Sequence, residues 1–380
     1  MLQFSKYQGL GNDFLMVDGR GSAGGDDSLG LTPGRVRRLC DRRFGVGADG
    51  VILALPPRGD GELRMRIFNA DGSEPEMCGN GIRCLARFLA DSDGDGAGRR
   101  WQVETLAGRI VPELQEDGTI RVDMGAPFLS PEAVPTTLPL GPAGIPQGSL
   151  EVVGRSWAVG AAGMGNPHVV VPVEDVAAVD LELVGAALEV HPAFPARTNV
   201  HVVQALTPDH LVMRVWERGA GPTLACGTGA CATLVVCHRL GLAERRARLD
   251  LPGGPLWIDW DPASDHLFMT GPAEAVFDAV VTPALWGDDD AGNEATGSDR
   301  LASDAVASDS PAAEAATIDC ATACVNGCVR PEACASAEAR QRVEALLGSR
   351  SLDDLVALAT NSLEARTRAR AEREIFRPLE

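Results

Sequence analysis

The sequence has little positive charge. Lys6 is the only lysine, and 34 basic residues stand against 53 acidic ones in a chain of 380, which gives a formal net charge of −19. Contact with phosphate groups needs clustered Lys and Arg, so this balance argues against nucleic acid and anionic membranes as partners. We therefore expect a small molecule as the ligand.

Long apolar runs are also missing. No run approaches the roughly 20 residues that span a bilayer. A signal peptide would need an uninterrupted apolar stretch within residues 1–16, but this segment contains Lys6, Asn12 and Asp13. We expect a cytoplasmic protein, in which the ten cysteines are catalytic, metal-binding or buried thiols and not a disulfide framework.

The acidic excess is concentrated near residues 288–319, where Asp, Glu, Ala, Ser and Gly dominate and Arg300 is the only base. Such a composition predicts a disordered linker. Helical patterns follow over 332–347 and 351–373. The sequence thus predicts four parts: an N-terminal half over 1–127 to which 272–285 returns, a second half over 128–271, a linker over 286–319, and a cysteine-containing helical extension over 320–380.

Short β-rich runs alternate with fewer helical ones before the linker, which indicates an α+β fold. The predicted strands are 14–18, 51–55, 63–69, 109–113, 120–124, 168–173, 199–205 and 210–217, and the predicted helices are 32–42, 81–90 and 229–240. A strand, a polar turn, a Cys-Gly motif and a helix occur twice in this order, which suggests a duplicated domain.

The duplicated motifs carry the chemistry. Cys78 opens CGNGIRC and Cys226 opens CGTGAC, each before a predicted helix. A helix N-terminus can bind a substrate carboxylate and favours the thiolate of a cysteine placed there. Two such thiols across one cleft could remove a proton from one face of a carbon and return it to the other. Burial as small apolar residues is the alternative, but two copies in matching contexts favour catalysis.

Several long motifs occur in the same order as in the diaminopimelate epimerase family, which this chain resembles over about residues 1–285. They are KYQGLGNDF, RRFGVGADG, FNADGSEPEMCGNG, GNPH, RTN and ERGAGPTLACGTG. The resemblance implies two pseudo-symmetric α/β halves, each a curved mixed or antiparallel sheet around a central helix, with the active site in the cleft between them. It also implies interconversion of LL- and meso-diaminopimelate, for lysine and peptidoglycan precursors, without cofactor or metal, by a homodimer.

By the same resemblance, Cys78 and Cys226 are the base and acid pair, and His168 and Glu217 assist proton movement. The implied substrate contacts are Asn12, Asn69, Gly79, Asn80, Asn166, Asn199, Glu217, Arg218, Gly227 and Thr228. Gly50 stands where some members of the family place a glutamine that touches substrate, so that side-chain contact is absent here.

Two alternatives remain open. Proline racemases share the fold and the paired cysteines, but they typically carry a His where this chain has Asn80. The second alternative is a metal-binding or redox protein acting through Cys320, Cys324, Cys328 and Cys334, which the resemblance does not cover. Their spacing matches only the first half of a standard zinc motif.

Overall fold

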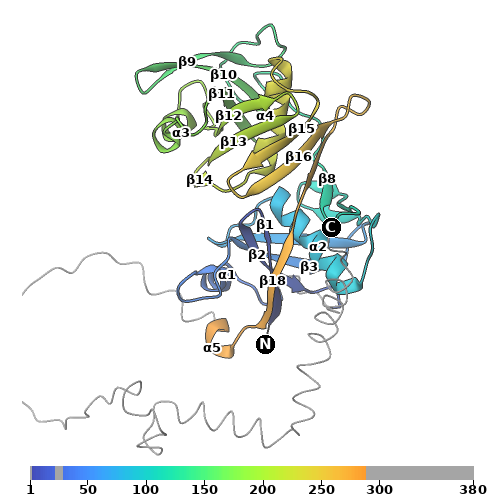
Figure 1. Ribbon diagram of the computed structural model, residues 1–380. Helices are drawn as coiled ribbons and strands as arrows, with labels where there is room; N and C mark the ends of the chain where they lie inside the picture. The colour runs from blue at the N-terminus through green and yellow to red at the C-terminus, as the bar shows by residue number, and fades with distance from the viewer. Residues whose placement is uncertain (1, 22–28, 288–380) are drawn as a thin grey trace, which may run out of the picture. The chain divides into compact units, whose positions relative to one another are not determined.

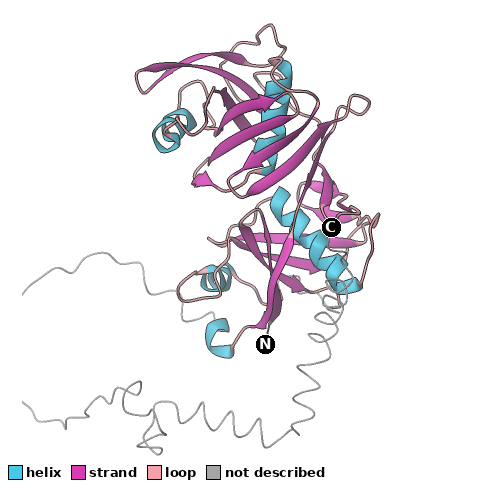
Figure 2. Ribbon diagram, in the orientation of Figure 1, coloured by secondary structure: helices cyan, strands magenta, loops and turns pink. Residues whose placement is uncertain are grey.

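The computed structural model describes residues 2–21 and 29–287. The linker and the helical extension expected beyond residue 287, with the four cysteines of that extension, lie outside the described residues. The described part contains two mixed sheets with five helices (Figures 1 and 2). The α+β class is confirmed.

The first sheet has seven strands, and it is antiparallel except where β2 pairs with β3 and β4 with β5. Its order is β18 (Glu274–Val280), β1 (Gln3–Gly9), β2 (Asn12–Asp18), β3 (Gly50–Leu55), β4 (Leu63–Asn69), β5 (Val103–Thr105) and β6 (Gly108–Ile110).

The second sheet has eleven strands and is parallel only where β11 pairs with β12 and β13 with β15. Its order is β7 (Glu113–Leu114), β8 (Ile120–Asp123), β17 (Leu267–Gly271), β16 (Gly254–Trp260), β15 (Arg246–Leu251), β13 (His210–Glu217), β12 (Asn199–Thr207), β11 (Pro167–Pro172), β10 (Arg155–Gly163) and β9 (Gln147–Val152), with β14 (Gly221–Thr223) paired to β13.

Each sheet packs on one long helix, as Figure 1 shows. Helix α2 (Gly79–Asp93) begins at Cys78 and ends at Gly94, whose left-handed backbone suits glycine. Helix α4 (Gly227–Arg239) begins at Cys226 and is buried on nearly all sides. The two helices lie in separate hydrophobic cores, so the predicted arrangement of two halves with central helices is confirmed.

Three shorter helices complete the described part: α1 (Pro33–Cys40), α3 (Leu181–Glu189) and α5 (Pro283–Trp286). The side chains of Thr32 and Asp180 cap the N-termini of α1 and α3. Helix α1 packs in a further core beside the first sheet, and α3 in one beside the second. No helix among residues 2–21 and 29–287 has both the length and the apolar character needed to cross a membrane.

Strand β8 belongs to both halves. Its backbone pairs with β17 in the second sheet, whereas its side chains Ile120 and Val122 are fully buried in the core around α2. The predicted strand 109–113 is divided in the structure, because β6 ends the first sheet and β7 begins the second. Pro112, which has no N–H to give to a ladder, lies between them.

Candidate active site

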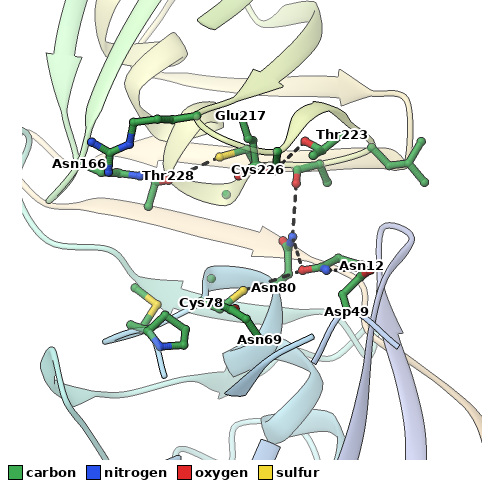
Figure 3. A pocket seen from close by; sticks show the side chains of 18 of the residues that line it. Asn12, Asp49, Asn69, Cys78, Asn80, Asn166, Glu217, Thr223, Cys226 and Thr228 are labelled. Carbon is green, nitrogen blue, oxygen red and sulfur yellow. Dashed lines mark hydrogen bonds between the residues drawn. The ribbon is translucent and has the colours of Figure 1, made fainter. Parts of the chain in front are cut away.

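A cavity of about 890 Å³ lies at the N-termini of α2 and α4. These two helix ends approach so closely that a Cβ added to Gly79 would stand 3.9 Å from the Cα of Gly227. The lining includes most of the site residues predicted from the sequence (Figure 3): Asn12, Asn69, Cys78, Gly79, Asn80, Asn166, Glu217, Arg218, Cys226, Gly227 and Thr228.

Cys78 is the N-cap of α2 and is partly exposed. Its Sγ accepts a hydrogen bond from the backbone N–H of Gly81 at 3.4 Å and lies 3.9 Å from Oδ1 of Asn12. Burial raises the pKa of this thiol, and the negative charge of Glu217 raises it further. The backbone N–H groups of Gly81 and Asn80 and the charge of Arg83 lower it.

Cys226 is the N-cap of α4 and is 5% exposed. Its Sγ lies 3.6 Å from the hydroxyl of Thr228. Burial raises the pKa of this thiol well above its usual value, and the Glu217 carboxylate raises it further, both by its charge and by accepting a hydrogen bond from the thiol. Thr228 and the N–H of Gly229 oppose these effects.

In both cysteines burial opposes the preference for the thiolate that the helix N-terminus supplies. The helix N-termini do lower both thiol pKa values, as the sequence indicated, but loss of solvent outweighs them. A hydrogen bond or a charge close to either sulfur therefore has a large influence on which thiol ionises.

Glu217, the last residue of β13, is held by Thr223 of the neighbouring strand β14. The Thr223 hydroxyl donates to Oε1 of Glu217 at 2.6 Å (Figure 3). This bond directs the carboxylate toward the turn that carries Cys226. Thr223 was not predicted from the sequence, and the duplicated motif gives no signal for it, because Pro75 occupies the matching position before Cys78.

Two predicted site residues do not line the cavity. His168 is fully buried, and its ring nitrogens are hydrogen-bonded to Asn166 at 2.7 Å and to His201 at 2.9 Å. Asn199 is also buried, and its amide binds the carbonyl of Pro167 and the N–H of Arg218. Both therefore touch the cavity only through a lining residue, Asn166 in one case and Arg218 in the other.

The histidine pair is kept neutral by its surroundings. Burial lowers the pKa of His168 well below its usual value and lowers that of His201 to about 3. The ring of His201 lies against the first turn of α4, so closely that a Cβ at Gly229 would stand 2.3 Å from it. The sequence did not indicate this contact, which explains the need for glycine at position 229.

Gly50 is the first residue of β3 and follows Asp49, which lines the cavity. A Cβ there would stand 2.4 Å from the backbone oxygen of Phe68 on the neighbouring strand. The backbone therefore leaves no room for the glutamine that some members of the resembled family carry.

Asp49 also lines the cavity, and the buried Arg83 contacts the lining residue Asn80, although the sequence did not point to either. The carboxylate of Asp49 accepts a hydrogen bond from Asn12 at 2.6 Å, and Arg83 donates to Asn80 at 3.0 Å. Within residues 2–21 and 29–287, no group of three or more His, Cys, Asp or Glu is arranged to hold a metal ion. The candidate metal ligands Cys320, Cys324, Cys328 and Cys334 lie outside these residues.

Comparison with known proteins agrees with the geometry. The family model for diaminopimelate epimerase matches residues 4–129 and 160–276. The chain is 61% identical to the diaminopimelate epimerase of Prochlorococcus marinus over 285 residues, which are 75% of this chain and 94% of that protein. It is 57% identical to that of Synechococcus elongatus over 276 residues, 73% of this chain and 96% of that protein.

Solved structures of lower similarity share the fold. A hydroxyproline epimerase from Agrobacterium vitis superposes with a TM-score of 0.53 at 18% identity, over 75% of this chain and 94% of that one. A phenazine biosynthesis protein of the PhzF family from Bacillus anthracis gives a TM-score of 0.51 at 17% identity, over 74% and 99%. At these identities the likeness concerns the fold alone.

Proposed function

The chain belongs to the diaminopimelate epimerase family of isomerases, and from this membership we propose that it interconverts LL- and meso-diaminopimelate by two-base proton transfer without a cofactor. The observation that carries the proposal is the pair of thiols, Cys78 and Cys226, on two helix N-termini that face one cavity. In each direction one sulfur takes the α-proton and the other donates a proton to the opposite face of the same carbon.

The helix ends supply the remaining requirement of this chemistry. Removal of an α-proton leaves negative charge that spreads into the substrate carboxylate, and preorganised N–H donors stabilise such charge. The first turns of α2 and α4 present N–H groups with the positive end of the helix dipole. Gly79 and Gly227 allow the substrate to approach both backbones.

Glu217 gives the two thiols different roles. Its carboxylate opposes ionisation of both thiols, but it acts on Cys226 by charge and by a hydrogen bond and on Cys78 by charge alone, and so we propose that Cys226 is the proton donor and Cys78 the base when the enzyme binds its first substrate. After one turnover the proton has moved from Cys226 to Cys78, and the reverse reaction restores the starting state. His168 assists through Asn166, which it holds at the cavity wall.

Substrate recognition is proposed to rest on polar groups away from the thiols. Asn69, Asn166 and Arg218 line the cavity, and Asn199 fixes the backbone of Arg218. Such polar groups can recognise a substrate that carries a second amino-acid group away from the reacting carbon, whereas proline has no such group to bind. We therefore favour diaminopimelate over proline as the substrate.

An exchange experiment tests this assignment. LL-diaminopimelate and L-proline are incubated separately with the purified full-length protein in deuterium oxide, and deuterium at the α-carbon is followed by NMR. The proposal expects exchange and formation of the meso isomer with diaminopimelate only. Exchange with proline and none with diaminopimelate would sink it.

We also propose a homodimer, as the family resemblance implies. Strand β18 is an edge of the seven-stranded sheet, and Val276, Phe277 and Val280 on it are 51%, 40% and 43% exposed. Exposed apolar residues on an unpaired strand edge favour association. Light scattering after size exclusion gives the mass directly, and a monomer at micromolar concentration would contradict the proposal.

A further inference from the structure

Four side chains form one continuous hydrogen-bonded chain beside Cys78, and Figure 3 shows three of them, Asn12, Asp49 and Asn80. Arg83 Nη2 donates to Asn80 Oδ1 at 3.0 Å. Asn80 Nδ2 donates to Asn12 Oδ1 at 3.2 Å. Asn12 Nδ2 donates to Asp49 Oδ2 at 2.6 Å.

Each end of this hydrogen-bonded chain can take only one role in hydrogen bonding. A guanidinium group can only donate hydrogen bonds, and a carboxylate can only accept them. The oxygen and nitrogen of an amide have nearly the same shape, so neighbouring groups decide how an asparagine is oriented. With Arg83 at one end and Asp49 at the other, Asn80 and Asn12 each have a single orientation that satisfies both neighbours.

Both ends are held firmly. Arg83 is fully buried, and its other hydrogen bonds go to the backbone oxygens of Gly79 and Pro272 and to the sulfur of Met269. None of its partners within residues 2–21 and 29–287 is a carboxylate. A buried cation without a counter-ion is costly. Its presence is hard to explain by stability alone, since an apolar side chain would fill the same space at lower cost.

Asp49 is fixed from the opposite side. Arg42 donates to its Oδ1 at 2.7 Å, and the backbone N–H of Asp13 donates to its Oδ2 at 3.1 Å. The side chain of Asp49 remains 40% exposed, so it can be changed without opening the core.

The locked orientation determines what the cavity presents. The Oδ1 atom of Asn12 lies 3.9 Å from the sulfur of Cys78, which places an acceptor and not a donor beside this thiol. The Nδ2 atom of Asn80 lies 3.5 Å from the backbone oxygen of Ala225, the residue before Cys226. A reversed Asn80 would set two oxygens against each other at this contact between the halves.

We propose that Asp49 and Arg83 are positioning residues, which lock Asn12 and Asn80 so that Asn12 offers an acceptor to Cys78 and to the α-ammonium group of the substrate. The statement about the ammonium group rests on the proposed function. The statement about Cys78 does not, because it concerns the protein without substrate.

The experiment measures alkylation of Cys78 by iodoacetamide, followed by peptide mass spectrometry on the full-length protein. In Asp49→Asn, residue 49 can donate as well as accept, so the lock on Asn12 at this end is lost. Asn12 can then turn its NH2 group toward the sulfur, at the cost of the hydrogen bond from Asn80, and stabilise the thiolate. Alkylation is expected to be faster by on the order of fivefold. In Arg83→Gln, the cation is lost and alkylation of Cys78 is expected to be slower.

Asp49→Asn and Arg83→Gln are thus expected to change the alkylation rate of Cys78 in opposite directions. A general loosening of the structure would instead expose Cys78 and raise the rate in both variants. Arg83→Lys keeps a charge and an obligate donor, and should restore a rate near that of the wild type. Asp250→Asn and Arg87→Gln are the matched controls, since both residues form ion pairs outside the cavity. If Arg83→Gln fails to fold, Asp49→Asn and Arg83→Lys still decide the question.

Kinetics supply the second readout. Asp49→Asn is expected to raise KM for LL-diaminopimelate by on the order of tenfold, with a smaller change in kcat, since a reversed Asn12 would set a donor against the ammonium group. Alkylation and KM values equal to those of Asp250→Asn would overturn the proposal, and so would a fall in kcat alone. An inactive wild-type protein would refute the proposed function. The alkylation rates would still test whether the hydrogen-bonded chain of Arg83, Asn80, Asn12 and Asp49 orients Asn12.

Discussion

Arg83 of α2 and Cys231 of α4 occupy matching positions, each at the same distance along the chain from the cysteine that begins its helix. The strands before the two helices also end in residues of different charge. Strand β4 ends at the neutral Asn69, whereas β13 ends at the acidic Glu217. Arg83 thus favours the thiolate of Cys78, whereas Glu217 opposes ionisation of both thiols and also accepts a hydrogen bond from Cys226. The two halves share a fold, but their charges break the symmetry.

The first prediction concerns the order in which the thiols ionise. Burial and Glu217 raise the pKa of both thiols, but Arg83 opposes this at Cys78, and the pKa of Cys226 is raised further above its usual value, so Cys78 should react first with iodoacetamide as pH rises. Glu217→Gln should lower the pKa of Cys226 and speed its alkylation, because a negative charge is lost. Mass spectrometry of the two peptides measures both rates. Glu151→Gln, on the exposed face of β9, is the control, and faster labelling of Cys226 in the wild type would contradict the prediction.

The second prediction concerns the two-base mechanism. Cys78→Ala and Cys226→Ala should each lower the rate of epimerisation by at least about 100-fold, since a positioned proton-transfer group contributes that much or more. The conversion of LL- to meso-diaminopimelate is measured by chiral chromatography. Cys40→Ala removes a buried thiol outside the cavity, whose pKa is raised to about 12, and should keep its activity. An active single variant would rule out a need for both thiols.

The third prediction links the histidine pair to stability. Burial lowers the pKa of His168 and His201 in the folded protein, so below about pH 6.5 the unfolded chain binds more protons and stability falls as pH falls. Each histidine contributes a slope of about 1.4 kcal/mol per pH unit there. Urea unfolding at several pH values between 4 and 7 should show this slope. In His201→Gln the slope should be smaller, whatever the absolute stability.

The fourth prediction concerns Gly50. A Cβ there would meet the backbone oxygen of Phe68, which cannot move without disturbing the pairing of β3 with β4. Gly50→Ala should therefore cost about 1–3 kcal/mol of unfolding free energy, as measured by urea denaturation. Gly96→Ala, where the added Cβ has nothing within 4 Å, should cost much less. If both substitutions cost the same small unfolding free energy, the pairing of β3 with β4 adapts to the added methyl group.

The fifth prediction concerns the residues beyond 287. The match to Prochlorococcus marinus diaminopimelate epimerase covers 94% of that protein but only 75% of this chain. A chain ending at residue 287 should therefore keep its epimerase activity. Metal analysis of the full and shortened proteins tests the cysteines at 320, 324, 328 and 334 at the same time. Loss of activity on shortening would show that the extension takes part in catalysis or assembly.

The sequence predicted the central elements better than the peripheral ones. Strands β4 and β13 and helices α2 and α4 were predicted within about two to three residues of their observed ends, because apolar runs and Cys-Gly starts are local signals. Strands β1, β5, β9, β10 and β14 to β18, and helices α3 and α5, were not predicted. Many of these lie at sheet edges or near glycines and prolines, where pairing with distant strands decides the conformation.

The sequence by itself determined the two thiol-bearing turns, because each is built from consecutive residues whose caps and glycines act locally. Only the tertiary structure decided what surrounds the thiols. Asp49 reaches Asn12 across 37 residues, Asn12 reaches Asn80 across 68, and Arg83 reaches Pro272 across 189. An asparagine, an arginine or an aspartate is compatible with many surface roles. Folding alone places these residues around Cys78 and gives each amide its direction.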